Sequence, residues 1–233
     1  MNLAVFGANG PTGRLLVAQA LDAGHAVTAV TRHPTDFPLA HPRLRVVAAD
    51  VYNFDSVSAA VEGKDAVLST LGVPYGRKPI SVYSVGATNI VRAMDAHGVR
   101  RLLAVSSSAT DPQDRSRDTG GGFFFEKLLK PIITATLGRT LYADMRLMEE
   151  ILAASDLDWT VVRPSGLFGT DAVTDYRTAP GFIKGRYTSR RDLAHSMLRE
   201  LDERRFVRAP MAVATFSEQP TVLQLIRQEA LSK

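Results

Sequence analysis

The sequence predicts an α/β protein with a doubly wound parallel sheet, and three observations support that prediction. Short apolar runs such as Leu3–Phe6 and Ala66–Thr70 alternate regularly with longer amphipathic stretches. These runs are apolar throughout, which is typical of parallel strands buried on both faces. A glycine-rich segment follows the first run directly. We therefore expect a parallel sheet with helices on both faces.

Each element is predicted from hydrophobic periodicity and from residues that begin or end helices. Pro11 suits the first turn of a helix, where its missing N–H costs nothing, and Gly24 suits the end of that helix. The expected strands are Leu3–Phe6, Ala26–Thr31, Arg45–Ala49, Ala66–Thr70, Leu102–Ser106 and Trp159–Val162. The expected helices are Pro11–Ala23, Asp55–Glu62, Val82–His97, Arg190–Leu201 and Thr221–Ala230.

The pattern becomes weaker after Val162. Ser165–Gly185 contains glycines, a proline and polar residues and is predicted to form loops, while Phe206–Thr215 is predicted to be extended. No linker rich in proline, serine or charge separates a second domain. We therefore expect residues 1–233 to form one dinucleotide-binding domain in which residues 163–233 form a small substrate-side cap.

Composition excludes several classes of function. The chain has 233 residues, and 28 Lys and Arg against 24 Asp and Glu give a net charge of +4, too small to demand a nucleic-acid partner. It has no cysteine, and its five histidines show no i, i+4 pair, so we expect no metal site. No apolar run approaches the ~18–20 residues that span a bilayer. With no signal peptide evident at the N-terminus, we expect a soluble cytoplasmic protein.

The glycine-rich segment Gly7-Ala8-Asn9-Gly10-Pro11-Thr12-Gly13 lies between a strand and a helix. This context is the one that dinucleotide binding requires. Gly7 permits a tight turn, Gly10 lets main-chain N–H groups approach a pyrophosphate, and Gly13 allows close packing of helix on strand. An ordinary strand-to-helix turn is the alternative interpretation.

The residue after the second strand indicates which dinucleotide binds. An NAD site usually has an acidic residue there, which accepts from the adenosine ribose. This chain has Arg32, and Asp36 comes several residues too late. A guanidinium pairs well with a 2′-phosphate, so we expect NADP(H), with NAD less favoured. A solvated surface arginine is the alternative.

The glycine spacing and four further motifs resemble the atypical and extended short-chain dehydrogenase/reductase superfamily. The resemblance extends over essentially the whole chain. It is strongest to the small NAD(P)H-binding group with the biliverdin/flavin reductases and the NmrA-like proteins, and it implies a Rossmann fold. The further motifs are Gly63–Val67 leading into Leu68–Gly72, Gly86–Val91, Val105–Ala109 and Asp158–Pro164.

The resemblance also implies which residues contact the cofactor. Asp50 and Val51 would contact the adenine, and the turn after the sixth strand would cover the nicotinamide. Residues 70–72 would flank the ribose on the nicotinamide side. Together with Arg32, the implied contacts are Gly7, Asn9, Gly10, Pro11, Thr12, Gly13, Asp50, Val51, Thr70, Leu71, Gly72, Ser106, Pro164, Gly166 and Leu167.

The candidate catalytic residues come from the same resemblance. Members of the superfamily use a serine or threonine after the fifth strand and a tyrosine four residues before a lysine. Ser107 and Ser108 occupy the serine region, and Tyr142 lies four residues before Arg146, which replaces the lysine. Arginine keeps the charge but has a different shape. The alternative is that the Tyr142 hydroxyl lies at the surface and that Arg146 pairs with Glu150.

An insert separates the serine region from the tyrosine segment. Asp111–Gly122 is polar and rich in glycine, and Phe123–Ile133 begins with three phenylalanines. The insert could be a lid with an apolar wall, a dimer surface or part of the core. A lid would favour a bulky apolar or aromatic substrate.

Two functions from different classes fit these observations. The first is an NADPH-dependent oxidoreductase that transfers hydride to a small, apolar or aromatic carbonyl, quinone or flavin-like acceptor. The second is an NmrA-like redox sensor that binds the dinucleotide without turnover. The retained serine and tyrosine favour the enzyme, which we expect to be a monomer or a homodimer. A sugar-nucleotide epimerase usually needs a longer C-terminal domain, so we disfavour it.

Overall fold

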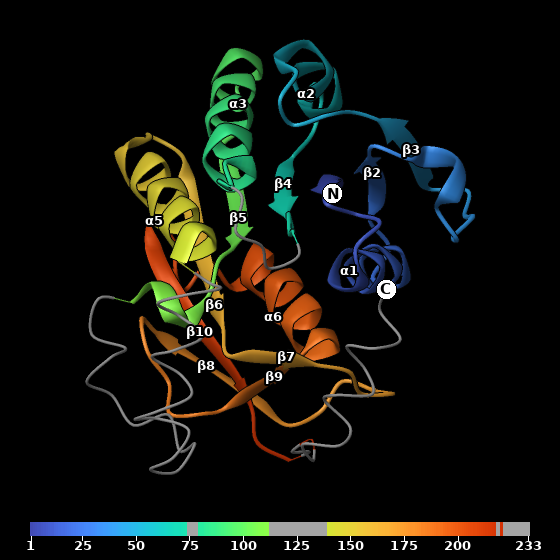
Figure 1. Ribbon diagram of the computed structural model, residues 1–233. Coiled ribbons are helices and arrows are strands. Elements are labelled where there is room, and N and C mark those ends of the chain that lie inside the picture. The colour runs from blue at the N-terminus through green and yellow to red at the C-terminus, as the bar shows by residue number, and fades with distance from the viewer. Residues whose placement is uncertain (74–78, 112–138, 218–219, 221–233) are drawn as a thin grey trace.

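An eight-stranded sheet forms the centre of the protein (Figure 1). The computed structural model describes residues 1–73, 79–111, 139–217 and 220. All neighbouring strands pair in parallel except the last two, β10 and β8, which are antiparallel. In spatial order the strands are β3 (Leu44–Ala48), β2 (Ala26–Thr31), β1 (Asn2–Phe6), β4 (Ala66–Ser69), β5 (Arg101–Val105), β6 (Asp158–Pro164), β10 (Ala209–Thr215) and β8 (Tyr176–Pro180).

Helices cover both faces of the sheet, so the predicted doubly wound α/β fold is confirmed. One face carries α2 (Phe54–Val61), α3 (Val82–His97) and α5 (Arg139–Ala154). The other face carries α1 (Pro11–Asp22) and α6 (Arg190–Glu203). Each predicted strand, and each predicted helix that lies among the described residues, occurs within two residues of its expected bounds.

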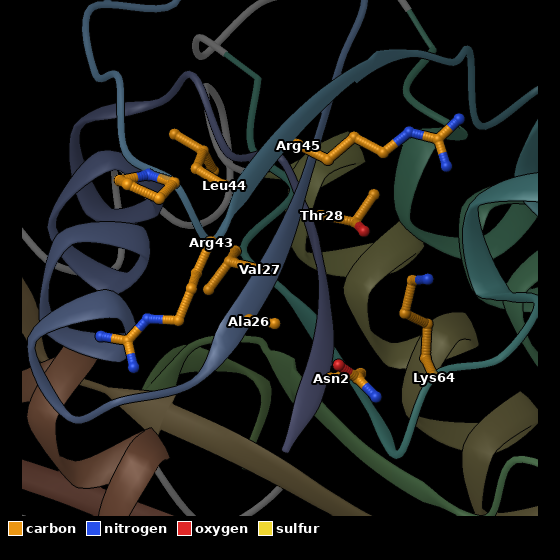
Figure 2. A pocket seen from close by; sticks show the side chains of 9 residues that line it. Asn2, Ala26, Val27, Thr28, Arg43, Leu44, Arg45 and Lys64 are labelled. Carbon is orange, nitrogen blue, oxygen red and sulfur yellow. The ribbon is translucent and has the colours of Figure 1, made fainter.

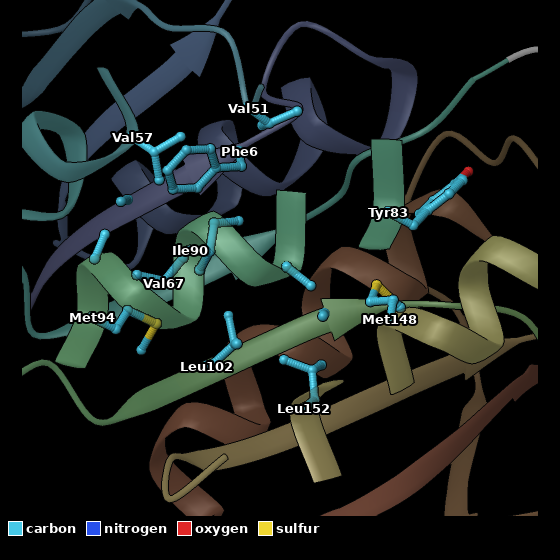
Figure 3. Close-up of a cluster of buried hydrophobic side chains, with 14 of the residues drawn as sticks. Phe6, Val51, Val57, Val67, Tyr83, Ile90, Met94, Leu102, Met148 and Leu152 are labelled. Carbon is cyan, nitrogen blue, oxygen red and sulfur yellow. The ribbon is translucent and has the colours of Figure 1, made fainter. Parts of the chain in front are cut away.

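Two apolar cores result, one on each face of the sheet. Figure 3 shows the core beneath α2, α3 and α5, where Phe6 of β1 lies near Val57 and where Ile90 and Met94 line the inner face of α3. The second core joins β1, β4 and β5 to α1 and α6. Because strands buried on both faces need apolar residues on both sides, their sequences are continuously hydrophobic.

The segment predicted as loops contains strands, so that prediction is wrong. β7 (Gly166–Phe168) pairs in parallel with β9 (Tyr187–Ser189) as a separate two-stranded ribbon, and β8 forms the edge of the main sheet. The ribbon strands are three residues long and partly polar, and β8 contains Arg177 and Pro180. Such short edge strands carry little periodicity, and proline is tolerated at an edge.

Two predictions lie outside the described residues: the helix Thr221–Ala230 and the phenylalanine run Phe123–Phe125. Within the described part of the chain, no helix is long and apolar enough to cross a membrane.

Candidate functional site

The glycine turn has the geometry that its spacing predicts. Gly7 has a φ of +72°, and a Cβ there would lie 2.5 Å from the main-chain oxygen of Thr70. A Cβ on Gly13 would overlap the carbonyl oxygen of Gly7 and lie 2.8 Å from the Cα of Ala8. Both positions therefore require glycine, Gly7 for the turn and Gly13 for the contact of α1 with the turn.

The beginning of α1 forms an open cradle of N–H groups. Gly10 is the N-cap residue and provides no side-chain cap, and the first turn has no acidic residue. The N–H groups of the first turn have no acceptors within a helix, and the dipole is positive there. A Cβ on Gly10 would meet only the Gly7 oxygen, at 3.3 Å. The cradle fits the pyrophosphate of a dinucleotide.

Arg32 lies at the end of β2, beside this turn in the sheet. Its side chain is exposed, and it has no hydrogen bond or ion pair with another described residue. On the turn itself, Arg14 donates from Nε to Oδ1 of Asn9 at 2.9 Å. Arg14 was not among the predicted site residues, and it adds a second cation beside the cradle.

The Asp50–Val51 segment after β3 is held in place by α3. The Asn89 side chain donates to the main-chain oxygen of Val51 at 2.8 Å. A Cβ on Gly86 would lie 2.9 Å from Leu71 Cδ1 and 3.5 Å from Val51 Cβ. Gly86 and Asn89 stand in a recognised motif, but their contacts with the predicted adenine segment were not foreseen. Asp50 is exposed and accepts from the main chain of Tyr52 at 3.0 Å.

The segment after β4 contacts the glycine turn. The Thr70 hydroxyl donates to the main-chain oxygens of Phe6, at 3.0 Å, and Gly7, at 3.3 Å. Leu71 is half-buried, and Gly72 is exposed beyond it. The ends of β1 and β4 are thus fixed side by side at the carboxyl edge of the sheet.

The serine segment after β5 is bonded to α5. Ser106 is 3% exposed and donates from Oγ to Glu149 Oε1 at 2.6 Å. Thr110, at the end of the short helix η2 (Ser108–Thr110), donates to the same oxygen at 2.6 Å. Ser107 accepts from the N–H of Ala109 at 3.2 Å, and Ser107 and Ser108 are half-buried.

Tyr142, Arg146 and Glu149 follow one stripe of α5, and only the first two were predicted as site residues. Tyr142 is 9% exposed and belongs to the core beneath α3 and α5. Arg146 donates to the main-chain oxygens of Ala109, at 3.1 Å, and Thr110, at 3.4 Å. The guanidinium thus contacts η2 instead of pairing with Glu150 as in the alternative interpretation. The i, i+4, i+7 spacing could have indicated Glu149.

The turn after β6 is fixed to the β7–β9 ribbon. Ser165 donates twice, from its N–H to Thr188 Oγ1 at 2.9 Å and from Oγ to the oxygen of Gly185 at 2.7 Å. Pro164 is buried, Leu167 is half-buried and Gly166 is exposed, with Tyr187 Cδ1 3.2 Å from the position of a Cβ on Gly166. Thr188 in turn donates to Val213 in β10 at 2.7 Å.

A cavity of about 250 Å³ lies elsewhere, at the amino ends of β1, β2 and β3 (Figure 2). Two of its three cations have partners at helix ends: Lys64 donates to the oxygen of Glu62 after α2, and Arg43 donates to the oxygens of Leu21 and Gly24 around the end of α1. Cations at helix C-termini stabilise the dipole. This cavity is at the opposite edge of the sheet from the glycine turn.

A tyrosine and a histidine with shifted pKa values contact each other in the C-terminal part. Tyr176 Oη is 2.6 Å from Nδ1 of His195. Burial, followed by the charge of Arg199, lowers the pKa of His195, and burial raises the pKa of Tyr176. Among the described residues, no group of His, Asp and Glu could hold a metal ion.

Comparison with known proteins identifies the family. A model of NAD(P)H-binding proteins matches residues 7–204, from the glycine turn to the end of α6. The chain belongs to the NAD(P)H-binding family. The relatives and structural neighbours of this chain include proteins named as dehydrogenases, reductases and epimerases. The resemblance to the atypical short-chain dehydrogenase/reductase group is therefore confirmed.

The relatives differ in length. A 3 beta-hydroxysteroid dehydrogenase/Delta 5→4-isomerase of Mycobacterium tuberculosis is 28% identical over 194 residues, 74% of this chain and 49% of that protein. The chain thus spans about half the length of that relative. An uncharacterized sugar epimerase of Bacillus subtilis is 28% identical over 210 residues, 88% of this chain and 89% of its own. This relative, which is named as an epimerase, has a similar length. The length of the chain is therefore no argument against an epimerase, contrary to the expectation from the sequence.

Solved structures share the fold. A short-chain dehydrogenase/reductase of Veillonella parvula in complex with NADP superposes with a TM-score of 0.74 at 19% identity, covering 93% of this chain and 95% of its own. A putative exported protein of Burkholderia pseudomallei superposes with a TM-score of 0.73 at 26% identity, covering 92% and 99%.

Proposed function

We propose that the protein is an NADPH-dependent oxidoreductase that reduces an apolar or aromatic acceptor, such as a conjugated carbonyl, a quinone or a flavin. The observation that carries this proposal is the glycine cradle at the start of α1 with the exposed Arg32 at the end of the neighbouring strand. The cradle fits a pyrophosphate, and a guanidinium matches a 2′-phosphate.

The chain's own groups would bind the cofactor and deliver a proton. When bound, the reduced cofactor supplies a hydride, which leaves the acceptor oxygen in need of a proton. The Ser106 hydroxyl already donates to Glu149, so Ser107 and Ser108 carry the better candidate hydroxyls. Ser107 Oγ accepts from Ala109, which leaves its own proton free to be donated.

Tyr142 is the second candidate proton donor, and Arg146 would assist it. The two residues lie one helical turn apart, as the superfamily pattern requires. Arg146 also holds the main chain of Ala109 and Thr110, which supports a positioning role for this arginine beside the serine segment.

Residues 163–233 would form the substrate-side cap of the single domain. The ribbon β7–β9 is fixed to β10, so the turn at Pro164–Leu167 has a firm support for covering the nicotinamide. A relative named as a hydroxysteroid dehydrogenase supports a bulky apolar substrate. We further propose a cytoplasmic protein that acts as a monomer or a homodimer.

The proposal is tested by following NADPH oxidation with quinones, flavins, aromatic aldehydes and a ketosteroid. We expect NADPH oxidation with at least one of these acceptors, and we expect no turnover of a UDP-sugar. Interconversion of UDP-sugars would overturn the proposal in favour of an epimerase. Dinucleotide binding without turnover of any acceptor would favour the redox sensor.

Tyr142→Phe tests the tyrosine with an identified acceptor. The change removes only the hydroxyl, so packing within the core should persist. If Tyr142 donates the proton, turnover falls by ~10²–10⁴-fold while NADPH affinity is retained. Unchanged turnover would assign proton transfer to Ser107 or Ser108, which Ser107→Ala and Ser108→Ala would separate.

A further inference from the structure

Glu149 connects two turns that come from different strands. Its Oε1 accepts from Ser106, which directly follows β5, and from Thr110 of η2. The same carboxylate pairs with Arg163 in β6, with Nη2 2.5 Å from Oε2 and Nε 3.2 Å from Oε1. Glu149 and Arg163 are each only 13% exposed, so this group is largely shielded from water.

These donors together stabilise the charged form of the buried Glu149 carboxylate. A charge removed from water is stable only when it is paired and hydrogen-bonded, and Glu149 has both an arginine and two hydroxyls. The donors come from β5, η2 and β6, so the carboxylate fixes the relative positions of those three segments. Loss of the carboxylate would remove the acceptor of the Ser106 hydroxyl, leave the Thr110 hydroxyl to donate to the main-chain oxygen of Ser107 at 2.7 Å, and leave Arg163 buried without this partner.

The two connected turns are those on either side of the proposed nicotinamide position. Ser107 and Ser108 follow Ser106, and Pro164 follows Arg163. By contrast, the segments proposed for the adenine half, Arg32 and Asp50–Val51, make no contact with Glu149. One side chain therefore connects two of the segments proposed for the nicotinamide half of the site, those after β5 and β6.

We propose that Glu149 is a positioning residue that preorganises the nicotinamide half of the dinucleotide site. This inference rests on the proposed function. It predicts that Glu149 affects binding of the whole cofactor but not of a fragment that lacks nicotinamide. A residue of general structural importance would affect both ligands alike.

The test compares the affinities of NADPH and of 2′,5′-ADP by calorimetry in Glu149→Gln. We expect the Kd of NADPH to rise about tenfold, because ordering of the loose turns then opposes binding. The Kd of 2′,5′-ADP should stay within about twofold. Glu150→Gln, which changes the exposed neighbouring carboxylate, is the matched control and should alter neither affinity.

A second variant covers the outcome in which Glu149→Gln does not fold. Thr110 is 1% exposed, and its hydroxyl lies 2.6 Å from Glu149 Oε1 and 2.7 Å from the main-chain oxygen of Ser107, so Thr110→Val removes its contact with both without burying an unpaired charge. Thr110→Val should weaken the binding of NADPH but not of 2′,5′-ADP, by a smaller factor than Glu149→Gln does. Equal weakening of both ligands, or no change in folded variants, overturns the inference while the proposed function stands. A wild-type protein that binds neither ligand overturns the proposed function.

Discussion

The first half of the chain fixes its site through main-chain atoms in direct contact, whereas the second half uses buried side-chain hydrogen bonds. Around Gly7 and Gly13 the main chain of β1, β4 and α1 approaches so closely that a Cβ would not fit. Around the β7–β9 ribbon, Thr188, Ser189 and Asp192 are fully buried and bond to neighbouring segments.

The difference reflects what each half must do. A pyrophosphate is recognised by N–H groups of the main chain, which glycine leaves exposed. A cap must instead hold irregular segments together, and buried side-chain hydrogen bonds suit this because each unmade bond is costly. Substitutions in the two halves should therefore separate binding from stability.

The largest expected effect is the loss of dinucleotide binding in Gly10→Val. Its Cβ would meet only one protein atom closely, so the fold should survive while the side chain fills the space for phosphate. We expect calorimetry to show at least about 100-fold weaker NADPH binding. Gly13→Val is the contrasting variant, in which the overlap with Gly7 should destabilise the fold itself. A folded Gly10→Val protein with normal affinity would place the pyrophosphate elsewhere.

In the second half, Asp192→Ala should lower stability and leave the adenine site unchanged. Asp192 accepts from Thr174 N at 2.7 Å, Thr174 Oγ1 at 2.8 Å and Thr215 Oγ1 at 2.5 Å. Leaving these donors unpaired should cost about 2–4 kcal/mol in the free energy of unfolding, measured with urea. Asp175 is exposed, so Asp175→Ala is the matched control. A matching loss of 2′,5′-ADP affinity would show that the halves are not independent.

The next effect concerns cofactor choice. NADPH should bind more tightly than NADH, and Arg32→Ala should remove most of that difference, about 1.5–3 kcal/mol. Arg45→Ala is a matched control, because Arg45 is also exposed but lies on β3 near its amino end. Equal affinity of the unmodified protein for both cofactors would contradict the NADP assignment.

The smallest expected effect is a pH dependence of the protein's stability that arises from a histidine in the second half of the chain. Burial lowers the pKa of His195 in the folded protein, so below about pH 6.5 the unfolded chain binds more protons than the folded one. Stability should therefore fall as the pH is lowered through the folded pKa. Urea unfolding between pH 7.5 and 5 should show this slope, and His195→Gln should reduce it. His25, whose pKa is also lowered mainly by burial, should account for part of the remainder.

The sequence predicts the first half well because its signals are local. The glycine spacing specifies the turn, and continuous apolar runs specify the buried strands. Helical spacing puts Glu149 on the same stripe of α5 as Tyr142 and Arg146, but its partners could not be predicted, because they depend on where α5 lies over β5 and β6. The ribbon was missed because Thr188 and Ser189 are polar residues typical of loops, yet both are buried by partners distant in the sequence. The cofactor contacts of the predicted site residues stay predictions.

The attachment of α5 at both ends of the insert has a consequence for how this protein could evolve. Before residues 112–138, η2 is held by Arg146 and Glu149; after them, Asp144 accepts from the N–H groups of Tyr83 and Ser84 at the start of α3. Because both attachment points are fixed by contacts outside residues 112–138, a change in the length of that segment need not displace either of them. Natural selection could thus exchange the sequence of this segment while the contacts that hold η2 and α5 in place are inherited unchanged.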